Sequence, residues 1–124
     1  MPTPISLSLQ AVLNAGAGGL YDSFQQSLQN ISESLVAAET QTLAVLTTGI
    51  QPSFPSITTP GFLILQNLDP TNYILYGPYI SSAQKVWGKI MPGHFALCML
   101  DPATVLSFTA NTATCALLAK LWNA

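Results

Sequence analysis

The sequence has 124 residues and a formal net charge of −2; 49% of its residues are hydrophobic and only 6% are charged. An average soluble domain is about a quarter charged. Three scattered lysines form no basic patch, which argues against nucleic-acid binding, and every apolar run is far shorter than the roughly 20 residues of a membrane-spanning helix. We therefore explain the low fraction of charged residues by a surface that other protein subunits cover.

The first segment has the clearest strand pattern in the chain. Five apolar residues alternate with mostly polar ones: Ile5, Leu7, Leu9, Ala11 and Leu13. A period of two places them on one face of a sheet, so we predict a β-strand over residues 5–13. The alanines and glycines of residues 15–19 predict a turn after this strand.

Residues 20–38 have a different periodicity. Their apolar residues recur at spacings of three and four: Leu20, Phe24, Leu28, Ile31 and Leu35. This spacing is typical of an amphipathic helix, and periodicity alone predicts a helix over residues 20–38. Residues 40–48 then favour a strand through their content of β-branched residues.

The rest of the chain is punctuated like an antiparallel β structure. Three prolines predict a loop over residues 49–60. Turn signals, Gly77-Pro78 among them, then recur about every 8–12 residues, which favours a β-sandwich or a barrel-like domain of about eight short strands. The strands are expected over residues 62–68, 73–76, 85–90, 95–100, 105–110 and 114–122. The alanine and leucine content of residues 113–122 favours a short helix as an alternative for the last of them.

No constellation of residues points to catalysis, a cofactor or a metal site. His94 is the only histidine and follows a Pro-Gly turn, and Asp69 and Asp101 each precede a proline, where turn formation is the natural interpretation. Cys98 and Cys115 have no CxxC spacing and cannot complete a zinc site with one histidine. We interpret them as buried thiols, with a disulfide as the alternative. We therefore expect a protein that is not an enzyme and needs no cofactor.

Three stretches of the second half resemble a known pattern. Residues 59–73 read TPGFLILQNLDPTNY and resemble the string TPGYLxxxNLDxTNYxxxG of small virion structural proteins of tailed bacteriophages. Residues 91–93 read MPG and are similar to a PGE-type turn of that family, with His94 in place of its acidic residue. Residues 109–118 read TANTATCALL and are similar to its AxANTAAxxLxxLL tail. The resemblance implies an all-β fold in a single domain over residues 1–124, which competes with the predicted helix.

The resemblance also implies a function. It points to a capsid decoration, or cement, protein, which binds the outside of the shell and stabilises the contacts between capsomers. The expected partners are the major capsid protein and further copies of the chain, most simply in a homotrimer. The expected location is the capsid exterior of the virion, after synthesis in the host cytoplasm.

Two other functions stay open at this point. A head-fibre base or a tail structural component with the same β domain is the first alternative. A carbohydrate-binding β module is a more distant one, suggested by the clustering of Tyr73, Tyr76, Tyr79 and Trp87.

Four residues are candidates for a protein interface. Phe54 and Ile57 lie in the proline-rich loop, where a restricted backbone lowers the entropy lost on docking. The alternative for Phe54 is that it fills the core of its own domain. Leu118 and Trp122 lie in the last predicted strand, which is apolar at both alternating sets of positions, so that both of its faces need to be covered.

Overall fold

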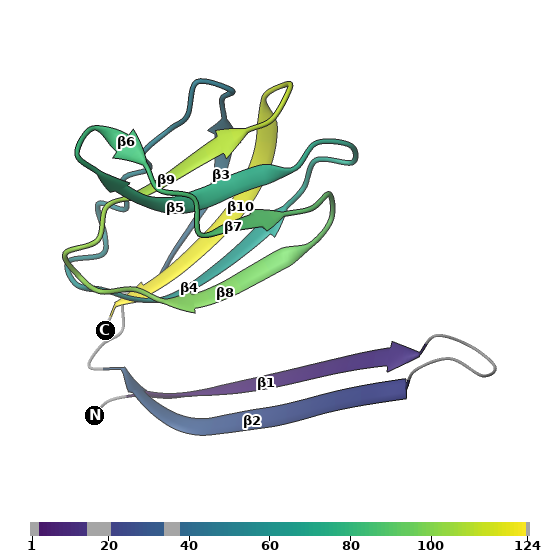
Figure 1. Cartoon of the computed structure of the whole chain (residues 1–124). Helices are drawn as coiled ribbons and strands as arrows, with labels where there is room; N and C mark the ends of the chain where they lie inside the picture. Colours follow the sequence, from purple (N-terminus) through teal and green to yellow (C-terminus); the bar gives the residue numbers. More distant parts are fainter. Residues whose placement is uncertain (1–2, 15–20, 34–37, 124) are drawn as a thin grey trace. The chain divides into compact units, whose positions relative to one another are not determined.

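The computed structural model describes residues 3–14, 21–33 and 38–123 (Figure 1). These residues form strands, turns and loops but no helix, and the expected all-β class is confirmed. No helix in the described part of the chain is long and apolar enough to cross a membrane. The chain separates into two compact units, Met1–Leu35 and Val36–Ala124.

The first unit contains a hairpin of two long antiparallel strands, β1 (Thr3–Asn14) and β2 (Tyr21–Glu33). The strand predicted over residues 5–13 is confirmed within β1. The turn predicted over residues 15–19 lies outside the described residues.

The helix predicted over residues 20–38 is wrong, because all of the described residues in that segment belong to strands. The reason is a β-bulge. The register pairs Leu7 with Leu28 and Ile5 with Ile31, so between these pairs one residue of β1 lies opposite two of β2. The extra residue turns an even spacing into a spacing of three, which imitates helical periodicity in the sequence.

The second unit is a sandwich of two antiparallel sheets that face each other as two layers (Figure 1). One sheet has the strand order β3-β10-β4-β8, with bounds of Ala38–Val45 for β3, Pro60–Asn67 for β4, Phe95–Met99 for β8 and Cys115–Asn123 for β10. In the other, β5 pairs with β9 along one edge and with β6 and β7 along the opposite edge. Its bounds are Ile74–Ile80 for β5, Ala83–Gln84 for β6, Gly88–Ile90 for β7 and Leu106–Ala110 for β9. These eight strands confirm the sandwich alternative over the barrel.

The core lies between the two sheets and follows from the alternation along the strands. Every second residue of β10 is buried there: Cys115, Leu117, Ala119 and Leu121. The facing sheet contributes Ile74, Leu106, Phe108 and Ala110. The strand expected over residues 114–122 is therefore confirmed, and the helix alternative is wrong, because only a period of two gathers this apolar set on one face.

β5 continues through the Gly77-Pro78 pair, where the sequence predicted the end of a strand, and that prediction is wrong. Proline has no backbone N–H to donate to a neighbouring strand. Pro78 nevertheless pairs with Leu106 of β9, and its carbonyl oxygen accepts a hydrogen bond from the Lys85 N–H at 2.8 Å. Partners on both edges thus hold the strand as far as Ile80.

Candidate functional site

The NLDPTNY string forms a turn that is organised around the fully buried Asn67. Its side-chain Nδ2 donates to the carbonyl oxygens of Asn72, at 2.8 Å, and Ile90, at 3.1 Å, and its Oδ1 accepts from the Asp69 N–H at 2.9 Å. Its backbone N–H and carbonyl oxygen bond to the turn at residues 93–94, at 2.9 and 3.0 Å. Through its side chain and its backbone, this one residue connects the turn to the end of β7 and to the Pro-Gly turn.

The second string that carries the resemblance meets the first at this place. Asn72 Oδ1 accepts a hydrogen bond from Thr112 Oγ1, and the Asn111 N–H donates to the Tyr73 carbonyl oxygen at 3.3 Å. Short polar side chains that bond to nearby backbone are typical of turns. The two strings therefore form interlocked turns whose chemistry is structural.

Asp69 closes the first of these turns. Its Oδ1 accepts hydrogen bonds from the backbone N–H groups of Asn72, at 2.6 Å, and Thr71, at 2.8 Å. These bonds favour the charged form and hold the pKa of Asp69 below its ordinary value of 3.8.

We expect the stabilising contribution of Asp69 to disappear in acid. A carboxyl whose pKa is lowered by folding stabilises the fold above its unfolded-state pKa, and the contribution is lost as the pH falls through the folded-state pKa. The difference in urea midpoint between the wild type and Asp69→Asn should therefore shrink as the pH falls below about 4. A difference that stays constant down to about pH 2 would contradict this role of the carboxylate.

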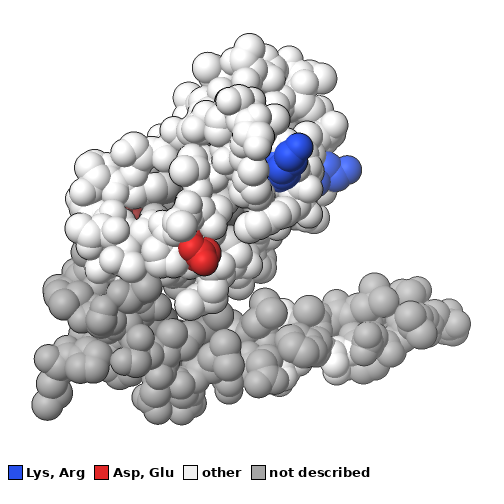
Figure 2. Space-filling model, turned by 60° about the vertical axis from the view of Figure 1, so that its left-hand side comes forward, with Lys and Arg blue, Asp and Glu red and all other residues white. Residues whose placement is uncertain are grey.

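The outward face of the β3-β10-β4-β8 sheet is largely apolar. We call it the outer sheet face, and its larger side chains are those of Thr40, Thr42, Phe62, Ile64, Gln66, Phe95, Leu97, Met99, Leu118, Lys120 and Trp122. Phe95 is 61% exposed and Met99 is 60% exposed. Lys120 is the single charged side chain in this set of described residues. Figure 2 shows, from one side, how sparsely charge is spread over the surface.

Two aromatic rings and a lysine stem pack together towards one end of the outer sheet face. Phe62 and Trp122 pack with their ring centroids 5.7 Å apart, and Lys120 Nζ lies 4.9 Å from the centre of the Trp122 ring. A shallow cavity of about 260 Å³ beside them is lined by residues that include Phe95 and Leu118. Aromatic residues and methionine with little charge are typical of the centre of a protein interface.

The four interface candidates divide into two pairs. Leu118 and Trp122 lie half-buried on the outer sheet face. Ile57 is only 8% exposed and belongs to the core, and Phe54 packs against the same core. Phe54 is partly buried, and its contact with the core of its own domain is the kind that the alternative for this residue described.

Side chains of β3 fix the proline-rich loop in this inward position. Gln41 Nε2 donates to the Ser53 carbonyl oxygen, and the Ser56 N–H donates to Glu39 Oε2, both at 2.8 Å. The loop is thereby tied to the edge strand of the sheet on either side of Phe54.

Phe95 and Met99 are surface residues that sequence reasoning did not single out. Residues 95–99 read FALCM and are apolar at every position, so alternation alone cannot tell which set faces outward. In the structure Ala96 and Cys98 pack against the core, and the larger side chains face outward. The continuous apolar run was the available signal that both faces of this strand carry apolar side chains.

Among the residues considered for chemistry, Asp69 lies close to Cys115. Cys98 and Cys115 are free thiols, and burial raises the pKa of each, with the negative charge of Asp69 adding to the effect at Cys115. His94 is exposed. Among the residues that the structure describes, no group of three or more His, Cys, Asp or Glu side chains is placed to hold a metal ion.

The four aromatic residues that suggested a carbohydrate module have different surroundings. Tyr76 packs against the core, Tyr73 lies under Lys89 Nζ at 4.9 Å, and Trp87 is 59% exposed. Tyr79 lines a polar cavity on the second sheet.

No family model, no curated protein and no solved structure matches the chain. Function is a property of sites and not of a fold alone, so it has to be argued from these surfaces.

Proposed function

We propose that the chain is a non-enzymatic structural protein of a tailed-phage virion, a capsid decoration protein that docks on the outside of the shell through its outer sheet face. The observation that carries the proposal is the exposure of Phe95 and Met99 on a sheet face with one charge. Large apolar side chains of this kind belong to the buried centres of protein interfaces. Contact with an apolar area of the shell covers them.

The resemblance of residues 59–73 and 109–118 to virion proteins supports this class of protein. Both segments contribute to the interlocked turns around Asn67, so they serve the stability of the domain. In this proposal the contact with the shell is made by β8 and β10, whose sequences are less distinctive.

The partner that we propose is the major capsid protein, and we expect the decorating unit to be a homotrimer. Lys120 is the single charged side chain on the described outer sheet face, so a neutral or weakly acidic area of the shell suits it best. Two copies that met through this face about a two-fold axis would bring their lysines together, which is unfavourable. We therefore assign the face to the shell and place contacts between copies elsewhere.

The double variant Phe95→Ser, Met99→Ser is expected to lose capsid binding while its fold stays intact. Full burial of such a side chain stabilises by about 1.5–3 kcal/mol, so the exposed 61% and 60% contribute about 1–2 kcal/mol each. Binding should weaken about 30-fold or more. Co-sedimentation measures the effect, with capsids of the encoding phage from which this protein has been removed.

Wild-type protein should also raise the temperature at which bare capsids fail, because it binds the assembled state.

Val105→Ser is the matched control for this experiment. Val105 is 51% exposed but lies in the segment before β9, outside the outer sheet face, and its variant should bind like the wild type. Wild-type affinity in the double variant would contradict docking through this face. A copy number far below that of the shell protein in purified virions would favour the head-fibre or tail alternative instead.

A further inference from the structure

A polar cavity of about 310 Å³ opens on the second sheet. Ser107 and Thr109 contribute to its floor, because they alternate along β9 with the core residues Leu106 and Phe108. The segment 48–51 forms one wall. It lies beside β9 through two backbone hydrogen bonds between Ile50 and Phe108, at 2.8 and 3.0 Å. The volume is at the lower end of the usual range for small-molecule sites, about 300–1,000 Å³.

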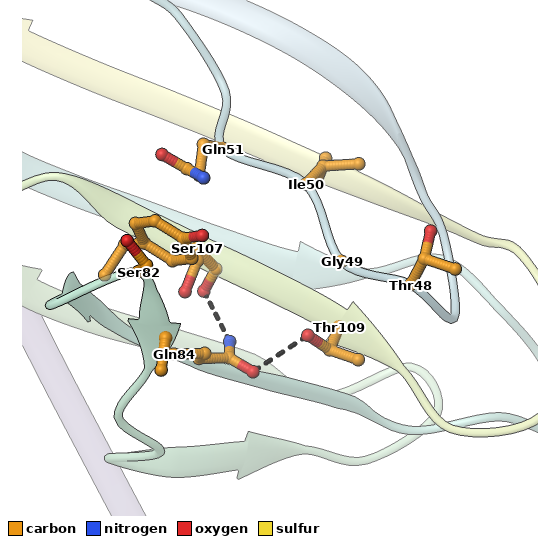
Figure 3. A pocket seen from close by; sticks show the side chains of 10 residues that line it. Thr48, Gly49, Ile50, Gln51, Ser82, Gln84, Ser107 and Thr109 are labelled. Carbon is orange, nitrogen blue, oxygen red and sulfur yellow. Dashed lines mark hydrogen bonds between the residues drawn. The ribbon is translucent and has the colours of Figure 1, made fainter.

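The lining of this cavity is rich in neutral hydrogen-bonding groups. Seven side chains carry a hydroxyl or an amide there: Thr48, Gln51, Tyr79, Ser82, Gln84, Ser107 and Thr109. None of the described residues that line it is charged. Figure 3 shows the side chains of segment 48–51 on one side and those of the β5–β6 hairpin and β9 on the other.

Gln84 is fixed in the floor of the cavity. Its Nε2 donates to the Ser107 carbonyl oxygen and its Oε1 accepts from Thr109 Oγ1, both at 2.8 Å (Figure 3). Its Nε2 also donates to the Leu75 carbonyl oxygen at 3.3 Å. Both amide hydrogens and the Thr109 hydroxyl hydrogen are thereby used. Lone pairs of Gln84 Oε1 and Thr109 Oγ1 are left as pre-positioned acceptors.

The groups at the rim of the cavity are free to adapt to a ligand. Thr48, Gln51 and Ser82 are exposed at the rim. Ser82 sits in the two-residue turn between β5 and β6 with a φ of 62°, and Ser81 before it has a φ of 54°. Asn-Gly is the preferred pair for such a turn, and backbone strain of this kind is found most often at functional sites. Ser82 keeps its hydroxyl group at the edge of the cavity.

We infer that this cavity binds a neutral sugar residue of a glycan. A pyranose presents hydroxyl groups that both donate and accept, which matches a fixed pair of acceptors facing adaptable hydroxyl and amide groups. The partly exposed Tyr79 ring offers an apolar surface to the C–H face of a sugar. A phosphate or a carboxylate would find no cation among these residues. The site lies on the sheet opposite to the outer sheet face, so the inference does not depend on capsid docking.

The test is an NMR titration of the full-length chain with the methyl glycosides of glucose, galactose, mannose and N-acetylglucosamine. At least one of them should cause saturable shifts at Gly49, Ser82, Thr109 and the Gln84 side-chain amide, with a Kd in the range of about 1–10 mM for so small and open a site. Glucuronate should bind more weakly than methyl glucoside, because the cavity has no cation to pair with its carboxylate.

Two rim variants and one control make the site assignment specific. Thr48→Val and Gln51→Ala should each weaken the binding about five-fold, the usual effect of one lost hydrogen bond, and both positions are exposed, so the fold is retained. Thr42→Val, on the outer sheet face, should bind like the wild type. Saturation by none of the four glycosides, shifts centred elsewhere, or equal binding by the rim variants would overturn the inference.

Discussion

Replacing Asn67 with alanine is expected to lower the free energy of unfolding by about 3–5 kcal/mol. Asn67 is fully buried, and its amide makes the hydrogen bonds that join the turn after β4 to the end of β7. Truncation leaves the carbonyl oxygens of Asn72 and Ile90 and the Asp69 N–H without these partners. Each buried group left unsatisfied costs about 1–3 kcal/mol, and a small cavity adds to the loss. Urea denaturation followed by tryptophan fluorescence measures the change.

Gln66→Ala is the matched control for Asn67→Ala. Gln66 is the neighbouring residue of β4, but its side chain is exposed on the outer sheet face, so its loss should change the free energy of unfolding by no more than about 0.5 kcal/mol. Similar effects of the two substitutions would contradict the role assigned to the Asn67 amide.

Replacing Gly77 with alanine is expected to destabilise the sandwich by about 3 kcal/mol or more. A Cβ at this position would lie 1.8 Å from the Lys85 carbonyl oxygen and 2.9 Å from the Trp87 nitrogen. These are backbone atoms, so the segment 85–87 has to move away from β5. That movement breaks the hydrogen bonds from the Lys85 N–H to Pro78 and from the Trp87 N–H to Tyr76, at 2.8 and 2.9 Å.

Gly88→Ala provides the comparison for Gly77→Ala. A Cβ at Gly88 would lie 2.7 Å from the Tyr76 hydroxyl oxygen, which is the far end of a side chain that can rotate. Gly88→Ala should therefore lower the free energy of unfolding clearly less than Gly77→Ala in the same denaturation experiment. A larger loss of stability in Gly88→Ala than in Gly77→Ala would contradict the close contact between β5 and segment 85–87.

Much of the fold was predictable because a period of two is a strong signal when one face is buried. The alternation in residues 5–13 and 114–122 located β1 and β10, and the regular turn signals between them indicated the sandwich. The helix prediction failed at one specific feature, since the bulge opposite Ser6 shifts the alternation of β2 by one residue. Such a shift becomes visible only when the residues of β1 are paired with those of β2, and a single sequence does not give that pairing.

The candidate interface was predictable only in part, for reasons that differ between the residues. Leu118 and Trp122 lie on the outer sheet face, because β10 is apolar on both faces and only one of them meets the second sheet. Phe54 and Ile57 pack inward, because Glu39 and Gln41 tie their loop to β3, a long-range contact that no local pattern reveals. Tertiary packing decides which side of an apolar segment is left at the surface.

The turn residues that carry the resemblance differ from the residues proposed to contact the shell. The most recognisable residues, in the NLDPTNY and ANTA strings, hold turns together, while the proposed contact residues Phe95 and Met99 lie in a short apolar strand without a motif. A resemblance carried by turn residues therefore supports a common fold more strongly than a common contact surface.

A cryo-EM reconstruction of decorated capsids, at a resolution that traces the strands, tests the central claim most directly. The account predicts one density for this domain at regular positions on the outside of the shell, with Phe95 and Met99 of β8 and Trp122 of β10 at the contact with the major capsid protein. It would be contradicted by a domain whose outer sheet face points to solvent, or by density found only on the tail or at a single vertex.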